Sequence, residues 1–504
     1  MTSIASRLSR YFAALLFSSL FASAASATVT FQTVTNTNDT GSGSLRAAVT
    51  AANANGADGA IISFDIGSSC GPHVIHLATE LPDLKYEIHF EGYGQTGSSP
   101  NSLYIYNGND AKICIILAGD NGVADGFGIA SSVADSMTMS VQGIAFSGFT
   151  HAALNIRGGS GHLIAGIRTG GTVGGFAMDP NGYDVILAAG VHGVTIGGDP
   201  QNAYDSYNQF GGAVNNAIYI ASASGATLAA HQNNINSNNI GFAVDANHNV
   251  TALPTGGAGV AVGGYKNYFF VDNIWYAGAS GVHFSNSDSH DNNLNLVDIR
   301  YAADNGLLID DDAHDNVVYG NDMYDNGGAG VRVVSGVNNS LQGNNISANG
   351  KLGIDLAGAG VTPDDNDSQV VDPNLANRAQ NFPVLTSAKG SDYKGTVKGS
   401  LTSTPGKYQI DIYLTNPCDA SGYGQGFNAV SYVNNTTPVV TIPGNITVQG
   451  QNTVDFTIPV TFSGSFGTDV SVTVTATDAS GNTSEFSACV PYENDTIFAD
   501  RFGD

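Results

Sequence analysis

The chain has 504 residues, and its 17 basic and 43 acidic side chains give a formal charge of −26. This charge argues against nucleic acid as a partner, because phosphate repels it, and disfavours an anionic polysaccharide unless a cation or a local basic patch intervenes. Only 12% of residues are charged and 64 are glycine, which suits many tight turns and little helix. The length allows two or three domains.

Residues 1–27 have the layout of a secretory signal peptide. Two arginines precede an apolar run over residues 11–22, and residues 25–27 form a small-residue cleavage site. That run is too short to span a bilayer, and no other stretch reaches 18 apolar residues. We therefore expect an exported protein, secreted or held at the cell surface, with no transmembrane segment.

Export permits disulfides. The four cysteines allow three pairings. Their positions favour Cys70–Cys114 and Cys418–Cys489, one bridge in each predicted domain, and four free thiols are the alternative.

The mature chain opens with a strand over residues 29–34 and the one convincing helix. Its apolar residues stand at i, i+3, i+4 and i+7: Leu45, Ala48, Val49 and Ala52. Ser42 or Ser44 is available as N-cap and Gly56 ends the helix. An amphipathic helix here suits the open end of a stacked repeat. Strands are expected at 61–66, 74–77, 87–90 and 103–106.

Residues 115–264 continue as coils of less regular length. Gly143 and Gly166 keep a 23-residue period, and insertions break it later, most plainly from Thr251 to Gly264. Such lobes often carry binding, although a solvated loop is the ordinary interpretation.

Residues 267–356 repeat. Gly281, Gly306, Gly330 and Gly353 recur at intervals of 25, 24 and 23 residues, and each precedes a short run with period-two alternation. The pattern predicts a parallel β-helix whose coils lie about 4.8 Å apart. Two further columns follow the same spacing: Ile274, Ile299, Met323 and Ile346 facing inward, and Asn292, Asn316 and Asn339 as an asparagine ladder at a turn.

Stacking places Trp275, Arg300 and Tyr324 in one outward row, an aromatic–guanidinium–aromatic arrangement that suits a sugar ring. The alternative is ordinary cross-strand packing. Asp298 and Asp322 flank the row on adjacent coils, a spacing that suits the two carboxyls of a retaining glycosidase or a shared cation, and equally a solvated face.

A second outward patch contains His283, Asp310, Arg332 and Asp355. Here Arg332 could act as the base of a lyase or neutralise an acidic sugar, with Asp310 and Asp355 holding Ca²⁺. An Arg332–Asp355 surface ion pair is the alternative.

Two further groups invite a metal interpretation. His290 and His314 stack one coil apart, which we interpret as a turn ladder. The oxygen-rich run with Asp364, Asp365 and Asp367 is a candidate calcium site, although it lacks a complete loop motif.

After residue 382 the sequence becomes rich in Thr and Val and alternates with a period of two residues. Strands at 408–414, 439–442, 453–462 and 469–477, with 481–487 as the last, predict a small antiparallel Ig-like β-sandwich over residues 383–492. The tail, 493–504, resembles short C-terminal motifs of exported bacterial proteins, but Arg501 replaces the usual glycine.

Six stretches spread over the mature chain resemble exported bacterial right-handed parallel β-helix proteins of the pectin-lyase-like superfamily. They are TVTNTND (33–39), GSLRAA (43–48), LP (81–82), GYGQTG (92–97), GIDL (353–356) and NFP (381–383). The resemblance implies a right-handed β-helix over residues 28–382, in keeping with the crossover rule, and contact with polysaccharide. The chain has no convincing counterpart of the Asn-Thr-Asp, Gly-His-Gly and Arg-Ile-Lys motifs of polygalacturonases. This departure makes a glycoside hydrolase the less favoured interpretation.

The sequence thus predicts an all-β, monomeric bacterial protein that binds an extracellular polysaccharide without turnover. The alternative is a polysaccharide lyase or glycoside hydrolase that uses Arg332 or the Asp298/Asp322 pair.

Overall fold

The computed structural model describes residues 29–56, 59–198, 206–357, 360–363, 375–391, 393–416, 418–432, 438–442, 452–461 and 470–494. The predicted signal segment, the predicted calcium ligands Asp364, Asp365 and Asp367, and the C-terminal tail beyond residue 494 lie outside these ranges. Among the helices in these ranges, none has the length and apolar character that a bilayer crossing requires.

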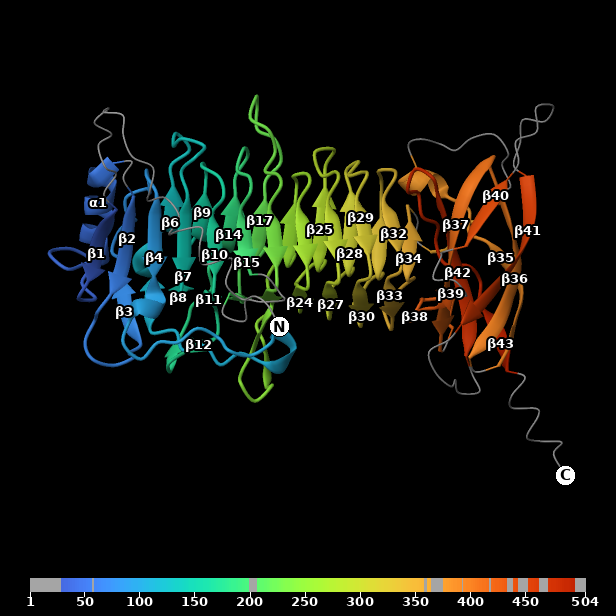
Figure 1. Ribbon diagram of the computed structural model, residues 1–504, viewed down its shortest axis with the longest axis horizontal. Helices are drawn as coiled ribbons and strands as arrows, with labels where there is room; N and C mark the ends of the chain where they lie inside the picture. The colour runs from blue at the N-terminus through green and yellow to red at the C-terminus, as the bar shows by residue number, and fades with distance from the viewer. Residues whose placement is uncertain are drawn as a thin grey trace, which may run out of the picture.

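Most of the described chain forms a right-handed parallel β-helix with three long sheets, seen from the side in Figure 1. The eleven-stranded sheet consists of β1 (Thr30–Val34), β2 (Ala60–Phe64), β4 (Ile88–Glu91), β7 (Met139–Gln142), β10 (Leu163–Ala165), β15 (Thr195–Gly197), β18 (Asn234–Asn236), β23 (Tyr268–Phe270), β26 (Asn293–Asn295), β29 (Val317–Tyr319) and β32 (Ser340–Gln342). The ten-stranded sheet consists of β3 (His73–His76), β5 (Ile115–Ala118), β8 (Ile144–Ser147), β11 (Arg168–Thr169), β16 (Gln209–Phe210), β19 (Asn239–Ile240), β24 (Asn273–Trp275), β27 (Asp298–Arg300), β30 (Asp322–Tyr324) and β33 (Asn345–Ser347). The nine-stranded parallel sheet consists of β6 (Asp125–Ile129), β9 (Ala152–Ile156), β14 (Tyr183–Leu187), β17 (Ile218–Ile220), β22 (Val260–Val262), β25 (Val282–Ser285), β28 (Leu307–Asp310), β31 (Val331–Val333) and β34 (Ile354–Leu356).

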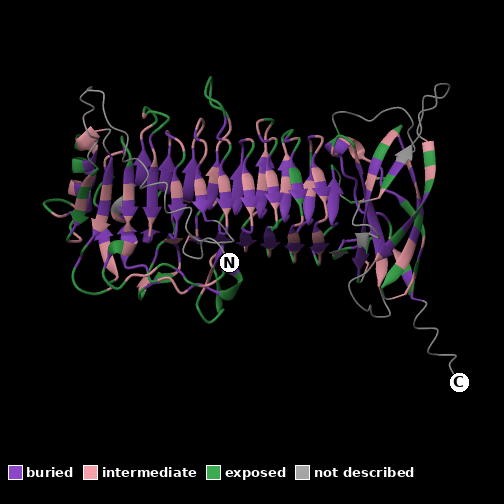
Figure 2. Ribbon diagram, viewed as in Figure 1, coloured by how far each residue is buried: buried purple, intermediate pink, exposed green. Residues whose placement is uncertain are grey.

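The predicted register between coils is confirmed. Ile274 pairs with Ile299, Ile299 with Met323, and Met323 with Ile346. All four side chains are at most 1% exposed, and Figure 2 shows most of the solenoid strands coloured as buried. Stacked apolar columns therefore fill the interior, and their burial stabilises each coil against its neighbours.

The asparagine ladder at the turn is also confirmed. Asn292 donates from Nδ2 to Oδ1 of Asn316 at 3.0 Å, and Asn316 donates in the same way to Asn339 at 3.0 Å. The ladder begins earlier, because Asn233 bonds Asn267 and Asn267 bonds Asn292. Each buried amide is thus satisfied by the coil beside it, which holds the coils in register.

The predicted N-terminal helix is α1 (Leu45–Asn55), with Ser44 as N-cap and Gly56 at its C-terminal end. Its buried residues are those expected from the sequence: Leu45, Ala48, Val49 and Ala52. It packs on β1 and β2, at the blue end of Figure 1. Its role as a cap stays a prediction.

One expected strand is wrong. Residues 103–106 belong to an irregular segment, 95–112, that contains the 3₁₀ helix η4 (Ile105–Asn107), and a second such turn, η3 (Gly92–Gly94), precedes it. Figure 1 shows this segment running along the solenoid to η4, below β24. Ile105 is buried there in a cluster with Tyr207 and Val271, so long-range packing overrides the local alternation.

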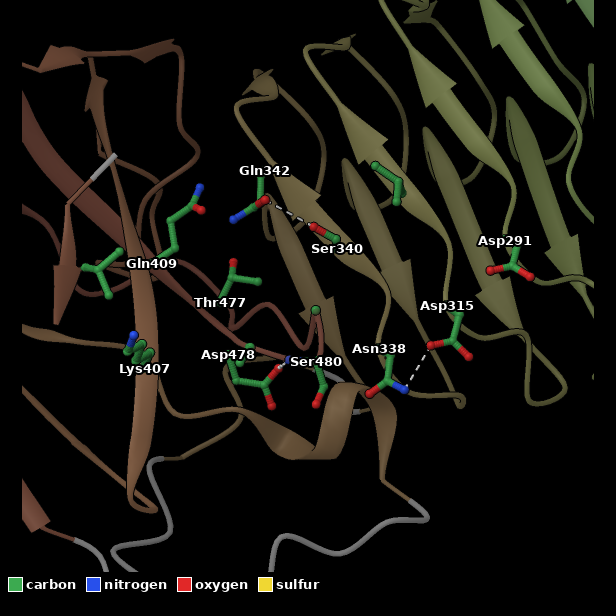
Figure 3. Close-up of a pocket in the computed structure, with 14 residues that line it drawn as sticks. Asp291, Asp315, Asn338, Ser340, Gln342, Lys407, Gln409, Thr477, Asp478 and Ser480 are labelled. Atoms are coloured by element: carbon green, nitrogen blue, oxygen red, sulfur yellow. Dashed lines mark hydrogen bonds between the residues drawn. The ribbon is translucent and has the colours of Figure 1, made fainter. Parts of the chain in front are cut away.

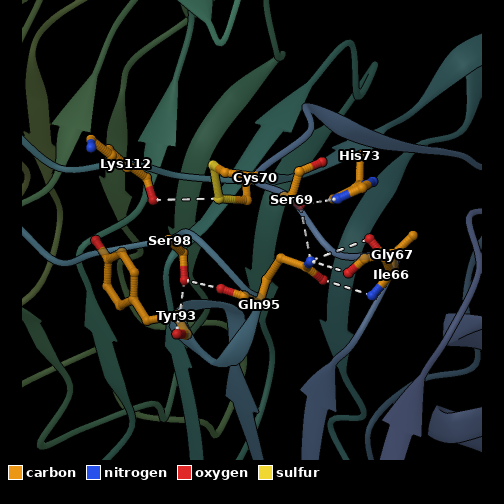
Figure 4. Close-up of a disulfide and its surroundings, with 10 residues drawn as sticks. Ile66, Gly67, Ser69, Cys70, His73, Tyr93, Gln95, Ser98 and Lys112 are labelled. Carbon is orange, nitrogen blue, oxygen red and sulfur yellow. Dashed lines mark hydrogen bonds between the residues drawn. A yellow bond between two sulfur atoms is a disulfide. The ribbon is translucent and has the colours of Figure 1, made fainter.

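Both ends of that segment are fixed near β3. Cys114 forms the predicted disulfide with Cys70. Gln95 donates to the carbonyl oxygens of Ile66 and Ser69 at 3.2 Å and accepts from the Ile66 N–H at 2.7 Å (Figure 4). The segment therefore has a rigid base and a tip several coils away.

The insertion expected from Thr251 to Gly264 lies earlier. The hairpin β20 (Phe242–Val244) and β21 (Val250–Ala252) leaves the solenoid beside β19, whereas β22 is an ordinary strand of the nine-stranded sheet. A smaller hairpin joins β12 (Thr172–Val173) and β13 (Phe176–Ala177), and η5 (Asp120–Gly122) precedes β6.

The C-terminal region, residues 384–494, has its own hydrophobic core and mostly antiparallel pairing. It consists of β35 (Val384–Gly390), β36 (Lys394–Ser403), β37 (Gly406–Thr415), β38 (Asn428–Ala429), β39 (Ser431–Tyr432), β40 (Val439–Ile442), β41 (Asn452–Thr461), β42 (Ser471–Asp478) and β43 (Val490–Asn494), with η6 (Ala376–Ala379) before it. The second predicted disulfide, Cys418–Cys489, is present. The Ig-like classification stays a prediction.

Residues 481–487 are not the last strand, which is β43. They lie against the final coil, where side chains of the C-terminal region take the place of a further coil. Thr483 accepts from the Leu341 N–H at 2.9 Å, Gln425 from the Asn349 N–H at 2.9 Å, and Glu485 from the Leu356 N–H at 2.8 Å. One donor near each sheet edge is thereby satisfied, so the junction is specific.

Candidate functional site

The predicted outward row on the ten-stranded sheet exists. Trp275 pairs with Arg300, and Arg300 with Tyr324, on β24, β27 and β30. The guanidinium carbon of Arg300 lies 5.3 Å from the ring centre of Trp275 and 5.2 Å from that of Tyr324. All three side chains are half-buried, so the row has a solvent-facing edge.

The row does not, however, offer its ring faces to a ligand. One face of Trp275 is covered by Arg300 and the other by Phe242 of the β20 hairpin, stacked at 4.3 Å. A sugar would meet ring edges and polar groups there instead of the indole face. The exposed rings around the row come from elsewhere: Tyr104, Tyr106, Tyr301 and Phe427.

Asp298 and Asp322 pair in register, as expected. Oδ1 of Asp298 accepts from Nε of Arg300 at 2.6 Å. Asp322 accepts from the Tyr324 hydroxyl at 3.0 Å and from Asn345 at 2.8 Å. Each carboxylate is thus oriented by a neighbour in the row, which leaves its second oxygen for other partners.

The environment raises the pKa of Asp298. Burial is the main cause and the nearby Asp322 charge adds to it, while the Arg300 hydrogen bond acts in the opposite direction. The pKa of Tyr324 is also raised, by burial and by the charge of Asp322. A carboxyl that keeps its proton to a higher pH than usual is a group that can donate a proton.

The 95–112 segment contributes Tyr106 to this face. Tyr106 is 54% exposed, and its neighbour Tyr104 lies 5.5 Å away between ring centres. Partial burial, Tyr104 and the carboxylates of Asp298 and Asp322 raise the pKa of Tyr106 to about 12. The phenol therefore stands near the acidic pair although it is nearly 200 residues distant in sequence.

The sequence did not single out Asp272, whose charge also contributes to the raised pKa of Tyr106. Asp272 is fully buried, and burial raises its pKa well above the usual value. Its Oδ1 accepts from Asn238, which in turn accepts from Asn208. Asp272 thus takes an asparagine position in a second ladder, and that column was the signal that could have revealed it.

The second predicted patch is brought together in part. Nε2 of His283 lies 2.8 Å from Oδ1 of Asp310 on the nine-stranded sheet. Arg332 pairs in register with Asp355. Asp355 was expected on the open face, but it is 2% exposed and lies close enough to Glu485 of the C-terminal region to raise that carboxyl's pKa. The catalytic role of the patch stays a prediction.

The histidine turn ladder is confirmed. His290 and His314 stack at 5.2 Å, and each lies within hydrogen-bonding distance of the following aspartate. Within the described ranges, no group of three or more His, Cys, Asp or Glu side chains is arranged to hold a metal ion. Calcium binding stays a prediction.

A cavity of about 550 Å³ opens at the junction. Figure 3 shows Lys407, Gln409 and Asp478 of the C-terminal region facing Ser340 and Asn338 of the last coils. The Asn338 N–H donates across the junction to Asn482 at 2.7 Å, and the Asn482 side chain donates back to Asn338 at 3.2 Å. Other bonds stay within one region: Asn338 donates to Asp315, and Asp478 accepts from the Ser480 and Asn482 N–H groups. The cavity is therefore a polar seam between two parts of the fold.

The family model that describes a right-handed β-helix region matches residues 246–373. No curated protein matches the sequence. Among solved structures, ORF18 of Geobacillus virus E2 is similar over 92% of this chain and 76% of its own, at 10% identity and a TM-score of 0.33. Tailspike protein 3 of bacteriophage CBA120 is similar over 64% of this chain and 56% of its own, at 15% identity and a TM-score of 0.29.

Proposed function

We propose that the protein is exported and binds an extracellular polysaccharide along the outward face of the ten-stranded sheet. The observation that supports this most is the row of polar residues in register on seven successive strands: Arg168, Gln209, Asn239, Asn273, Asp298, Asp322 and Asn345. A polar row parallel to the helix axis suits a linear, hydroxyl-rich ligand, and the exposed tyrosines beside it supply apolar contact.

The two halves of this row have different roles in the proposal. At its N-terminal half, the β20–β21 hairpin covers the row, and Gln209 donates to the Val244 carbonyl oxygen at 2.8 Å. At its C-terminal half, Asp322 is only half-buried, and so is Tyr324 on the same strand. Phe427 of the C-terminal region lies beside this half, with its ring centre 6.5 Å from that of Tyr324. The glycan is expected over the half from β27 to β33.

The two ends of the solenoid have structural roles in such a protein. The helix α1 covers the N-terminal end of the core, and the C-terminal region, as an Ig-like sandwich over residues 383–492, closes the other end and borders the binding face. Two disulfides suit an extracellular setting.

Purified mature protein incubated with a panel of polyuronides and neutral glycans, with and without calcium, tests the proposal. We expect retention on at least one glycan, without new reducing ends and without the ultraviolet absorbance of the unsaturated products that a lyase releases. Trp275→Ala should weaken retention by about 0.5–2 kcal/mol, because Arg300 loses the ring that positions it. Failure to bind any glycan would remove the proposal.

A glycoside hydrolase is the second candidate, and the raised pKa of Asp298 beside Asp322 favours it. In that case Asp298 donates the proton to the leaving oxygen and Asp322 acts as the partner carboxylate. If the wild-type protein releases new reducing ends and the Asp298→Asn variant does not, the protein is a hydrolase and not only a binding protein.

A further inference from the structure

The N-terminal half of the polar row contains a second, enclosed site. A cavity of about 370 Å³ lies between β11, β16, the end of the 95–112 segment and the β20–β21 hairpin. Its lining includes Arg168 and Gln209 from the sheet, Asp110 from the segment, and Asp245 and Asn249 from the hairpin turn. It is separate from the Asp298/Asp322 pair by four strand steps, about 19 Å along the axis.

Arg168 has no ionic partner there. Its Nε is buried without a hydrogen-bond partner, and no hydrogen bond or ion pair involves its guanidinium in the described part of the chain. Beside it, Oε1 of the buried Gln209 is also without a partner. The Arg168 side chain is half-buried, and a guanidinium that is partly removed from water and has no ionic partner favours an anion that arrives from outside.

The two carboxylates of the lining do not supply that anion. Asp110 accepts from the Ser102 N–H at 2.7 Å and the Ser102 hydroxyl at 2.6 Å. Asp245 accepts from the side-chain amide of Asn249 at 2.8 Å, and from the Asn249 and Asn247 N–H groups at 2.9 and 2.8 Å. These donors lower the pKa of both carboxyls, so both are ionised, and ionised carboxylates accept hydrogen bonds from hydroxyl groups.

We propose that this cavity binds a sugar residue with an acidic substituent. The carboxylate or sulfate oxygens of the sugar accept hydrogen bonds from Arg168, and its ring hydroxyls bond to Asp110, Asp245 and the side-chain amides. The proposal rests on the proposed function and narrows it to an acidic polysaccharide. A guanidinium matches a planar or tetrahedral oxyanion by paired hydrogen bonds. Arg168 is also the local positive charge that a chain of net charge −26 needs in order to accept an anionic glycan.

Binding of three monosaccharides to the full mature protein tests this, by calorimetry at low salt: D-galacturonate, galactose 6-sulfate and D-galactose. We expect at least one acidic sugar to bind about 10-fold or more tightly than galactose. The comparison of D-galacturonate with galactose 6-sulfate then shows whether the site prefers a carboxylate or a sulfate. Arg168→Gln should remove that preference, a loss of about 10- to 100-fold for a charged hydrogen-bonded contact. Arg168→Lys should keep part of it.

Arg157→Gln is the matched control, because Arg157 follows β9 on another sheet and pairs with Asp83, and it should leave all three affinities unchanged. Removal of an unpaired guanidinium should not lower the melting temperature of Arg168→Gln, so loss of fold cannot mimic the result. Equal binding of galactose and the acidic sugars, no binding of either acidic sugar, or an unchanged preference in Arg168→Gln overturns the proposal. Retention of a neutral polysaccharide together with any of these results would leave the proposed function standing.

Discussion

The outward faces of the ten-stranded and nine-stranded sheets come from the same coils but differ in chemistry. On the ten-stranded face, Arg300 is held between two aromatic rings, and Tyr106 stands beside the acidic pair. On the nine-stranded face, His283 meets Asp310, and the row ends with Asp355 buried at the junction. Stacking alone produces ladders on both faces.

The difference lies in what is added to the coils. The 95–112 segment and the β20–β21 hairpin both extend along the ten-stranded sheet, where they meet: the Asn109 N–H donates to the Asp245 carbonyl oxygen at 3.3 Å. They enclose one part of the polar row and border the other. A ladder becomes a candidate site where such insertions shield it and supply side chains from outside the repeat.

The largest effect is expected from removing the base of that segment. Cys70→Ser with Cys114→Ser opens a bridge between residues 44 apart, which should lower the free energy of unfolding by about 4 kcal/mol through added chain entropy. Glycan retention should fall as well, because Tyr106 loses its support. The urea midpoint and retention measure the two effects.

The second disulfide provides the control. Cys418→Ser with Cys489→Ser spans 71 residues and should cost a similar free energy, with a smaller loss of retention, because within this loop only Phe427 borders the row. If the first double variant retained glycan as well as wild type, the segment would not belong to the site.

The stability of the protein should depend on pH through a buried glutamate at the end of the nine-stranded sheet. Burial raises the pKa of Glu485 from 4.5 to about 7, against the N–H groups of Leu356 and Thr362, which lower it, and Asp355 adds to the increase. The folded state therefore holds a proton that the unfolded chain releases. The contribution of protonated Glu485 to the free energy of unfolding is fully present below about pH 4.5 and is lost as pH rises through about 7. The total loss is about 3 kcal/mol.

Melting curves of wild type and Glu485→Gln from pH 4.5 to 8 measure this. We expect the wild-type melting temperature to fall across that range and the variant's to change less. A wild-type profile that is flat, or that rises over this interval, contradicts the protonated junction.

The regular coils were predictable because their register follows from spacing alone. Nearly constant intervals, with a glycine column that marks each coil, place Trp275, Arg300 and Tyr324 in one row. The faces of those rings were not predictable, because Phe242 reaches Trp275 from a hairpin whose boundaries the Gly- and Ala-rich sequence conceals. Tyr106 was missed for a related reason: residues 103–106 alternate like a strand, and only the buried contact of Ile105 with Val271 fixes their position.

Two exposed tyrosines on different sheets test the role of the ten-stranded face. Tyr106→Ala should weaken glycan retention by about 1–2 kcal/mol through loss of an exposed ring beside the acidic pair. Tyr319→Ala is the matched control, because Tyr319 is 53% exposed on the eleven-stranded sheet. Equal losses in the two variants would mean that retention is a general property of the surface.

The smallest effect is expected on the nine-stranded face. Asp310→Asn breaks a contact with His283 whose side chains are 22% and 30% exposed, and pairs with this exposure contribute less than about 1 kcal/mol. Retention should be unchanged, since neither side chain borders the polar row. If the protein proves to cleave a polysaccharide and Asp310→Asn abolishes the release of products, the chemistry belongs to His283, Asp310 and Arg332, and the ten-stranded face is left with binding alone.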